Sequence, residues 1–343
     1  MIRFLHAADL HLDSPFSGLT PELAADRRKL QRQLPAKIIS LANERHCDLL
    51  LLAGDVFDGA RICPETVEAL VRAFERFEGQ VFIAPGNHDP WHDRSPWALT
   101  AWPENVHIFK TDAEAVELPG CVVRGGAFTS AECYDGLPVA VPDEKLQIGV
   151  FHGDPETPGP YRYFSAEELA GSGLDYLALG HIHRTQLPKN AGGAWYGWPG
   201  VTMGRGFDEC GVHGVFHVEL DHGRCETELI PLPGPRYEKL TVAYGDTPRL
   251  PTDSGNVICR LTVTGEADGP DFDGLKAALE PKFLSLELRD ETVPVRDLWG
   301  ACGDGTLRGL TLSALKKQYD SGDETAALAA RYVLAALEGG DAP

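Results

Sequence analysis

Five short apolar runs in the chain each end in a cluster of polar residues. Each run is about four to eight residues long and is bounded by Gly or Pro, a pattern typical of strands that are buried on both faces of a sheet. The carboxyl ends of such strands carry the binding sites of open α/β folds, so these polar residues are expected to converge. The five segments read FLHAADLH (4–11), LLLLAGDVFD (49–58), VFIAPGNHD (81–89), IGVFHGD (148–154) and YLALGHIH (176–183).

Helical patterns separate the first three runs. The apolar spacing and strong helix formers after Pro21 predict a helix from Pro21 to Asn43 with a kink at Pro35, where the ring removes an amide donor. A second helix is predicted to begin at Pro64, because proline is favoured at the first helical position. Strands that alternate with helices in this way indicate an α/β layered domain.

The pattern changes after Asp89, where the predicted strands become shorter. Residues 191–211, which are rich in glycine and aromatics, are expected to form a surface loop. Three prolines and a glycine interrupt the pattern at 231–237. We therefore predict two domains, one over residues 1–235 and a smaller accessory α+β domain over residues 236–343. The last helical segment, 324–338, is alanine-rich and is expected to pack on its own domain or on a partner helix.

Composition limits the classes of partner. The chain has 343 residues and a formal net charge of −20, which argues against a broad surface for nucleic acid or anionic membranes but leaves room for a local cationic path. Its 8 cysteines include no CxxC pair, which favours reduced thiols in a cytosol. The sequence begins without a secretory signal pattern and has no long apolar stretch, so we expect a cytoplasmic protein without a membrane span.

The polar clusters have the chemistry of a metal centre. Oxygen donors from Asp and Asn mixed with imidazole nitrogen suit Mn²⁺, Fe²⁺ or Zn²⁺. Seven or eight such groups are more than one ion requires, which predicts two divalent ions that share a bridging carboxylate. Two adjacent cations activate water and stabilise the oxygens of a phosphoryl displacement. The residues therefore predict hydrolysis of a phosphate ester.

The motifs D-x-H, GD-x-x-D, GNHD, a lone His and GH-x-H, in this order over residues 9–183, resemble the calcineurin-like metallophosphoesterases. The resemblance implies a sandwich of two facing β-sheets flanked by helices. The segments AADLHLDSPFSGL, GDVFD and PGVTMGRGFDECG are similar to bacterial DNA-repair exonucleases of the SbcD and YhaO type. That likeness implies a Mn²⁺-dependent nuclease subunit that works with an SMC-like ATPase and often dimerises.

The same resemblance implies a role for each motif residue. Asp55 would bridge the two ions, His88 would act on the leaving oxygen without binding metal, and Asp58 would accept a hydrogen bond from His88 and orient it. Some nuclease members carry a His at the position of Asp58. Arg205, which follows the last ligand motif, is a candidate contact to the substrate phosphate. The remaining ligands would be Asp9, His11 and His183 on one ion and Asn87, His152 and His181 on the other.

Other interpretations of these residues stay open. Five basic residues between Arg27 and Lys37 could follow a phosphate backbone, although a solvated helix face is the simpler interpretation. Three tryptophans after GNHD are expected to pack rather than to stack on bases. The acidic charge favours a rival substrate, a small phosphodiester or phosphomonoester. A third hypothesis is a metal-stabilised scaffold without catalysis, but such a scaffold would not need a leaving-group acid at His88.

Overall fold

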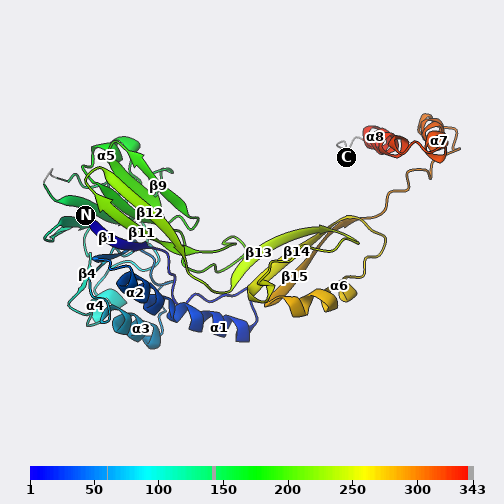
Figure 1. Ribbon diagram of the computed structural model, residues 1–343. Helices are drawn as coiled ribbons and strands as arrows, with labels where there is room; N and C mark the ends of the chain where they lie inside the picture. The colour runs from blue at the N-terminus through cyan, green and yellow to red at the C-terminus, as the bar shows by residue number, and fades with distance from the viewer. Residues whose placement is uncertain (60, 141–143, 339–343) are drawn as a thin grey trace. The chain divides into compact units, whose positions relative to one another are not determined.

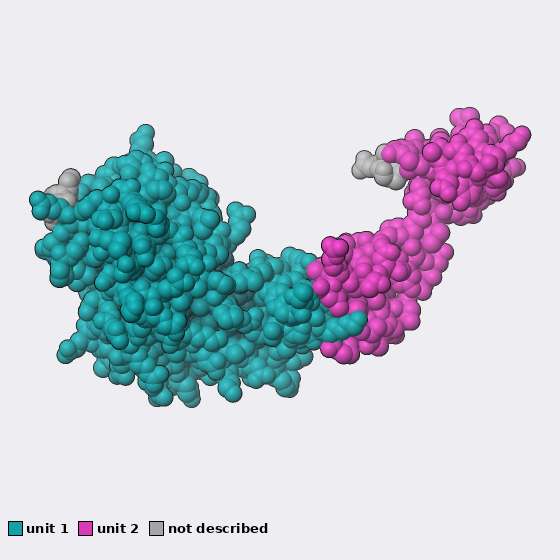
Figure 2. All heavy atoms as spheres, in the orientation of Figure 1, with its two compact units in different colours: residues 1–239, 251–260, 282–285 teal, residues 240–250, 261–281, 286–343 magenta. Residues whose placement is uncertain are grey.

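The computed structural model describes residues 1–59, 61–140 and 144–338 and divides into two compact units (Figures 1 and 2). The first unit comprises residues 1–239, 251–260 and 282–285. The second comprises residues 240–250, 261–281 and the chain from residue 286 onward. The domain boundary expected after residue 235 stays a prediction. None of the helices in the described part of the chain is long and apolar enough to span a membrane.

The first sheet has the strand order β12-β11-β1-β2-β3-β4. Strands β1 to β4 run parallel to one another, and β11 lies antiparallel to β1. The hairpin of β11 and β12 closes this edge of the sheet. The strands are β1 (Ile2–Ala7), β2 (Leu49–Leu52), β3 (Gln80–Ile83), β4 (Val106–Ile108), β11 (Gly214–Asp221) and β12 (Arg224–Pro231).

Four helices connect the strands of this sheet. The helix predicted from Pro21 is two helices that meet at Gln33, because Pro35 is accommodated in the first turn of the second one. Figure 1 shows α2, α3 and α4 on one side of the sheet. The four helices are α1 (Pro21–Arg32), α2 (Leu34–Glu44), α3 (Pro64–Phe74) and α4 (Pro96–Leu99).

The second sheet has the order β5-β6-β7-β8-β10-β9. Its strands are β5 (Glu114–Glu117), β6 (Cys121–Gly125), β7 (Leu146–His152), β8 (Tyr176–Gly180), β9 (Gln186–Ala191) and β10 (Ala194–Trp198). Helix α5 (Ala166–Gly171) precedes β8 and begins with a capping box formed by Ser165 and Glu168.

The prediction of a surface loop over residues 191–211 is wrong for residues 194–198, which form strand β10. Strand β10 pairs with β8 and β9, and its last residue, Trp198, is fully buried. The glycines at 192 and 193 belong to the tight turn between β9 and β10, whereas the aromatic residues after them favour a strand.

Apolar side chains from both sheets form the core of the sandwich. Leu49 and Leu51 of β2 pack with Ile148 and Ala178 of the second sheet. Leu50 and Leu52 point to the other face of β2, where they pack with side chains from α2 and α3. Both faces of the first sheet are therefore covered, as expected for parallel strands. The two-sheet sandwich flanked by helices is confirmed.

Between residues 236 and 338 the chain forms a three-stranded sheet, β13-β14-β15, and three α-helices. Leu312, Ala330 and Leu334 form the apolar contact between the last two helices. The elements are β13 (Arg236–Ala243), β14 (Val257–Glu266), α6 (Phe272–Leu279), β15 (Ser285–Val293), α7 (Leu307–Asp320) and α8 (Thr325–Glu338), with short 3₁₀ turns at Ser254–Asn256 and Glu280–Lys282.

Candidate metal centre

The carboxyl ends of β1, β2, β3, β7 and β8 bring the motif residues together. The Asp55 carboxylate lies between two imidazoles, with Oδ2 3.7 Å from His11 Nε2 and 3.3 Å from His152 Nε2. Asp9 Oδ1 lies 3.9 Å from His183 Nε2. Asp9 therefore forms one donor cluster with His11 and His183, and another with Asp55 and His152.

Strained backbone turns these side chains toward one another. Asp9, His11, Asp55 and His181 have left-handed φ angles of 50°, 43°, 48° and 93°. Residues other than glycine rarely adopt this conformation, and it persists where surrounding contacts hold it. The amides of Asp9 and His11 donate to the carbonyls of Gly54 and Asp55 at 3.0 and 2.9 Å. The two aspartate loops therefore hold each other in place.

Two motif glycines permit this close packing. A Cβ atom on Gly54 would lie 2.3 Å from His152 Nδ1, and one on Gly86 would lie 2.2 Å from Asp55 Oδ1. Gly54 also has a φ of +87°. Any side chain at these positions would displace a candidate ligand.

Hydrogen bonds fix which imidazole nitrogen faces the centre. His152 Nδ1 lies 2.9 Å from the carbonyl oxygen of Ala53, which can only accept, so Nδ1 donates and Nε2 is the nitrogen that faces the centre. His11 Nδ1 likewise lies 2.9 Å from the Asp58 carboxylate. Such outward partners are typical of metal-binding histidines.

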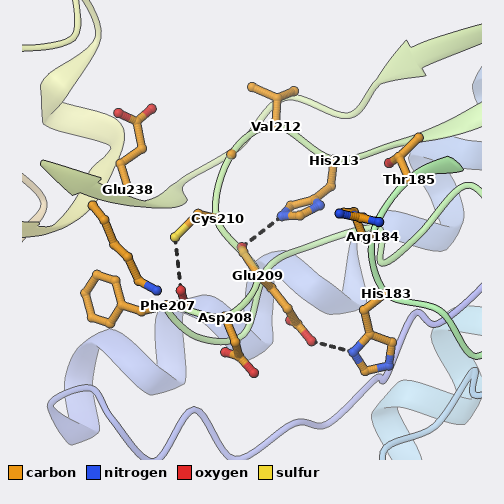
Figure 3. A pocket seen from close by; sticks show the side chains of 12 residues that line it. His183, Arg184, Thr185, Phe207, Asp208, Glu209, Cys210, Val212, His213 and Glu238 are labelled. Atoms are coloured by element: carbon orange, nitrogen blue, oxygen red, sulfur yellow. Dashed lines mark hydrogen bonds and ion pairs between the residues drawn. The ribbon is translucent and has the colours of Figure 1, made fainter.

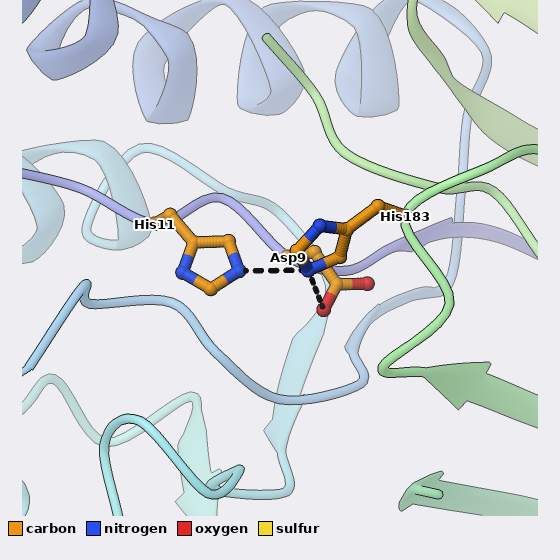
Figure 4. Close-up of side chains that lie close together, drawn as sticks. All are labelled: Asp9, His11 and His183. Atoms are coloured by element: carbon orange, nitrogen blue, oxygen red, sulfur yellow. Dashed lines mark hydrogen bonds and ion pairs between the residues drawn. The ribbon is translucent and has the colours of Figure 1, made fainter. Parts of the chain in front are cut away.

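The inward atoms are suited to cations. His152 Nε2 lies 3.0 Å from Asn87 Oδ1, and His11 Nε2 lies 3.2 Å from His183 Nε2 (Figure 4). In the metal-free protein a shared proton holds each of these pairs together, and a bound cation would take the place of that proton. All of these donors are nitrogen or oxygen atoms, so the residues fit divalent ions. His181 is placed beside them, with its amide 3.1 Å from Asp9 Oδ1 and its ring 4.6 Å from that of Tyr161.

Opposite charges inside the centre shift one another's pKa values. Burial opposes ionisation of Asp55, but His152 and His11 outweigh it and lower the pKa of Asp55. Burial also disfavours a charged His152, yet Asp55 raises the pKa of His152 to about 9. Partial burial lowers the pKa of His88, although Asp55 opposes this effect. A neutral His88 ring still carries one N–H donor.

Asp58 has a different partner from the one expected. Its Oδ1 accepts hydrogen bonds from His11 Nδ1 at 2.9 Å and Arg205 Nη1 at 3.0 Å, whereas His88 Nδ1 lies 3.8 Å away. That distance allows an ion pair but is too long for a hydrogen bond. The expected hydrogen bond from His88 is therefore absent, and Asp58 Oδ1 accepts from His11 and Arg205 instead.

Arg205 lies beside the centre, in contact with a residue that the motifs did not indicate. Glu209 is buried and lies four residues after Arg205, whose Nη2 donates to Glu209 Oε1 at 2.7 Å. Glu209 Oε1 also lies 2.8 Å from His183 Nδ1, at the edge of a pocket of about 640 Å³ (Figure 3). Burial opposes ionisation of Glu209, but His183 and Arg205 lower its pKa. Both residues lie in the segment PGVTMGRGFDECG that carries the resemblance, but the sequence indicated no role for Glu209.

Asp89 completes the GNHD motif without pointing at the donors. Its Oδ2 accepts from the amides of Val56 and Phe57 at 2.8 and 3.1 Å, and its Oδ1 accepts from the amide of Gly86 at 2.7 Å. The side chain therefore fastens the loop after β3 to the loop after β2.

The basic run of α1 is partly structural. Arg27 is fully buried and donates to the carbonyls of Gly204 and Pro235. Arg32 donates to Thr66 and lies within ion-pair distance of Asp13. These two residues are therefore already engaged within the protein, which removes them from a phosphate-binding path.

Residues 2–185 match the model of the calcineurin-like phosphoesterase family, and the chain belongs to that family. The chain is 30% identical over 330 residues to the metallophosphoesterase YhaO of Bacillus subtilis, a match that spans 87% of this chain and 80% of YhaO. It is 24% identical over 383 residues to the SbcD component of the SbcCD nuclease of Rhodobacter capsulatus, with 91% and 85% covered. A solved archaeal phosphodiesterase matches 67% of this chain and 100% of its own, with a TM-score of 0.39 and 14% identity.

Proposed function

We propose that the protein is a two-metal phosphodiesterase that acts on DNA as an exonuclease subunit and works with an SMC-like ATPase. The observation that carries the proposal is the place of the Asp55 carboxylate, which lies between His11 Nε2 and His152 Nε2. A carboxylate in that position suits a bridge between two cations.

One group of donors would lie on each side of the Asp55 carboxylate. Each group combines imidazole nitrogen with an oxygen donor, which suits Mn²⁺ and also Fe²⁺ or Zn²⁺. Divalent ions at this site supply Lewis-acid activation of water and of a phosphate ester. Asp9, His11 and His183 would hold one ion and Asn87, His152 and His181 the other.

His88 has the position of a residue that acts on substrate. Its side chain is 45% exposed, whereas those of His11 and His152 are fully buried. Substrate can therefore reach the His88 ring, which can donate a proton or a hydrogen bond to the leaving oxygen. The backbone amide of His88 donates to Asp55 Oδ1 at 2.9 Å, which ties the position of the ring to the bridging carboxylate.

Support for DNA as substrate comes from the likeness to the SbcD component of the SbcCD nuclease. The chain after residue 235 supports a partner-binding role, because α7 and α8 carry apolar side chains that are largely exposed. These are Leu307, Leu310, Leu328 and Leu337. The net charge of −20 favours the alternative, a small phosphate ester that needs no broad cationic surface.

A substrate comparison tests the proposal. Purified protein with Mn²⁺ is incubated with end-labelled duplex DNA, with bis(p-nitrophenyl) phosphate and with p-nitrophenyl phosphate, and product release is measured for each. We expect release of nucleotides from DNA. Hydrolysis of either nitrophenyl ester without cleavage of DNA would favour the small-ester alternative. Two bound ions without hydrolysis of any substrate would indicate a scaffold.

A further inference from the structure

Five side chains form a closed ring of contacts beside the Asp9 carboxylate. Arg205 joins two carboxylates, with Nη1 3.0 Å from Asp58 Oδ1 and Nη2 2.7 Å from Glu209 Oε1. Each carboxylate faces the Nδ1 atom of one imidazole, His11 at 2.9 Å and His183 at 2.8 Å. The Nε2 atoms of these two imidazoles are 3.2 Å apart and close the ring (Figure 4).

We propose that Arg205 and Glu209 are positioning residues that set the metal affinity of one half of the centre, the half formed by Asp9, His11 and His183. An outward partner on Nδ1 fixes the orientation of an imidazole and leaves Nε2 to bind metal. Glu209 is that partner for His183. Arg205 holds Glu209 and Asp58 at one spacing, so it links the orientations of both rings.

The contacts of Arg205 favour this role over a contact to substrate phosphate. Its Nε also lies 3.2 Å from both carboxylate oxygens of Glu209, and its backbone amide donates to Glu209 Oε2 at 2.8 Å. Nε and Nη2 of the guanidinium therefore both contact the buried carboxylate of Glu209. Such a bidentate pair fixes the relative orientation of an arginine and a carboxylate.

The loop that carries the pair is itself anchored. The buried guanidinium of Arg27 donates to the carbonyl of Gly204 at 2.7 Å, directly before Arg205. His213 Nε2 lies 3.0 Å from the carbonyl of Glu209. Both ends of the segment between Gly204 and Glu209 are thus held by buried or partly buried side chains, as a positioning device requires.

The other half of the centre has a backbone group at the equivalent place. His152 Nδ1 donates to the backbone carbonyl of Ala53, which side-chain substitution does not remove. The inference rests on the proposed function, since divalent metal is the ligand. It adds that the two ions depend differently on Glu209.

A calorimetric titration of metal-free protein with Mn²⁺ tests the inference. Wild-type protein is expected to bind two ions. Glu209→Ala is expected to lower the affinity for one ion by about 10- to 100-fold and to leave the affinity for the other unchanged. Glu209→Gln keeps an oxygen for His183 Nδ1 and is expected to lose less affinity. Glu219→Ala, which removes a carboxylate paired with Arg3 across β11 and β1, is the matched control and should bind both ions normally.

Arg205 variants separate positioning from substrate binding. Arg205→Ala is expected to lower the affinity for the same ion as Glu209→Ala does. The double variant should bind that ion only slightly more weakly than either single variant, because the pair acts as a unit. Unchanged Mn²⁺ affinity with a raised KM for the ester would overturn the inference, as would equal weakening of both ions. If the alanine variants unfold, Glu209→Gln and Arg205→Lys carry the same comparison.

The titration needs no substrate, so its result can be distinguished from the result of the substrate comparison that tests the proposed function. Two ions in wild-type protein without DNA cleavage would contradict the nuclease proposal alone. Wild-type protein that binds no ion would contradict both.

Discussion

Replacing Gly54 with alanine should damage both the stability of the protein and the place of His152. The new Cβ atom would lie 2.3, 2.6 and 2.7 Å from the Nδ1, Cγ and Cβ atoms of His152. The ring has no room to retreat, because it is fully buried and Nδ1 donates to the carbonyl of Ala53 at 2.9 Å. Either the loop after β2 or the histidine must therefore move.

Three contributions give the size of the effect. A left-handed φ costs a residue with a side chain about 1–2 kcal/mol. Overpacking of a dense core costs about 1–3 kcal/mol, and loss of a hydrogen bond costs about 1 kcal/mol. The free energy of unfolding should therefore fall by about 3–6 kcal/mol, out of the roughly 5–15 kcal/mol typical of a domain.

Urea denaturation of the metal-free protein measures this change. Gly223→Ala is the control, because Gly223 has a φ of +71° and a Cβ atom added to it would meet nothing within 4 Å. It carries the backbone strain without the crowding. We expect Gly54→Ala to be less stable than Gly223→Ala by at least about 2 kcal/mol. Equal losses in the two variants would refute the claim that close packing on His152 requires glycine.

Two further predictions concern buried groups. Asp89→Ala removes the acceptor of three backbone amides. Because each unmet amide costs about 1–3 kcal/mol, the free energy of unfolding measured in urea should fall by at least about 3 kcal/mol. A loss under about 1 kcal/mol, the net value of one hydrogen bond, would contradict this account. Burial lowers the pKa of His6 from 6.5 to about 3, so below pH 6.5 the unfolded chain binds a proton that the folded chain does not. Stability should then fall as pH decreases, with a slope from this residue that steepens below pH 6.5 toward about 1.4 kcal/mol per pH unit. His6→Gln should remove that contribution when the two proteins are compared by urea denaturation between about pH 6.5 and 5.

The convergence of the donors could be predicted because each one is close in sequence to the strand that positions it. Asp9, Asp55 and Asn87 follow the ends of β1, β2 and β3 within a few residues, and parallel strands of one sheet end at the same edge. A pattern of buried strands is therefore enough to indicate that these side chains meet.

The sandwich itself came from the resemblance to a family. The run Leu49–Leu52 is buried on both faces and shows no alternation of polar and apolar residues. Such a run does not reveal which of its side chains meet helices and which meet a second sheet. Strand β10 was missed for a related reason, because its glycines and aromatics are also common in loops.

The contacts around Arg205 could not be predicted either. Glu209 approaches His183 because the segment after Gly204 folds back, and that path depends on the buried Arg27 of α1, more than 170 residues earlier in the chain. Asp58 likewise takes His11 and Arg205 as partners through tertiary packing. Local sequence patterns identify candidate ligands but not the side chains that orient them.

The most direct test of the central claim compares wild-type protein with His88→Ala at equal occupancy by Mn²⁺. The substitution keeps the backbone amide that donates to Asp55, so both ions should be retained, and their number is checked by calorimetry. Release of nucleotides from end-labelled duplex DNA should fall by about 10²- to 10⁴-fold if His88 acts on the leaving oxygen. Equal rates in the two proteins would contradict the account.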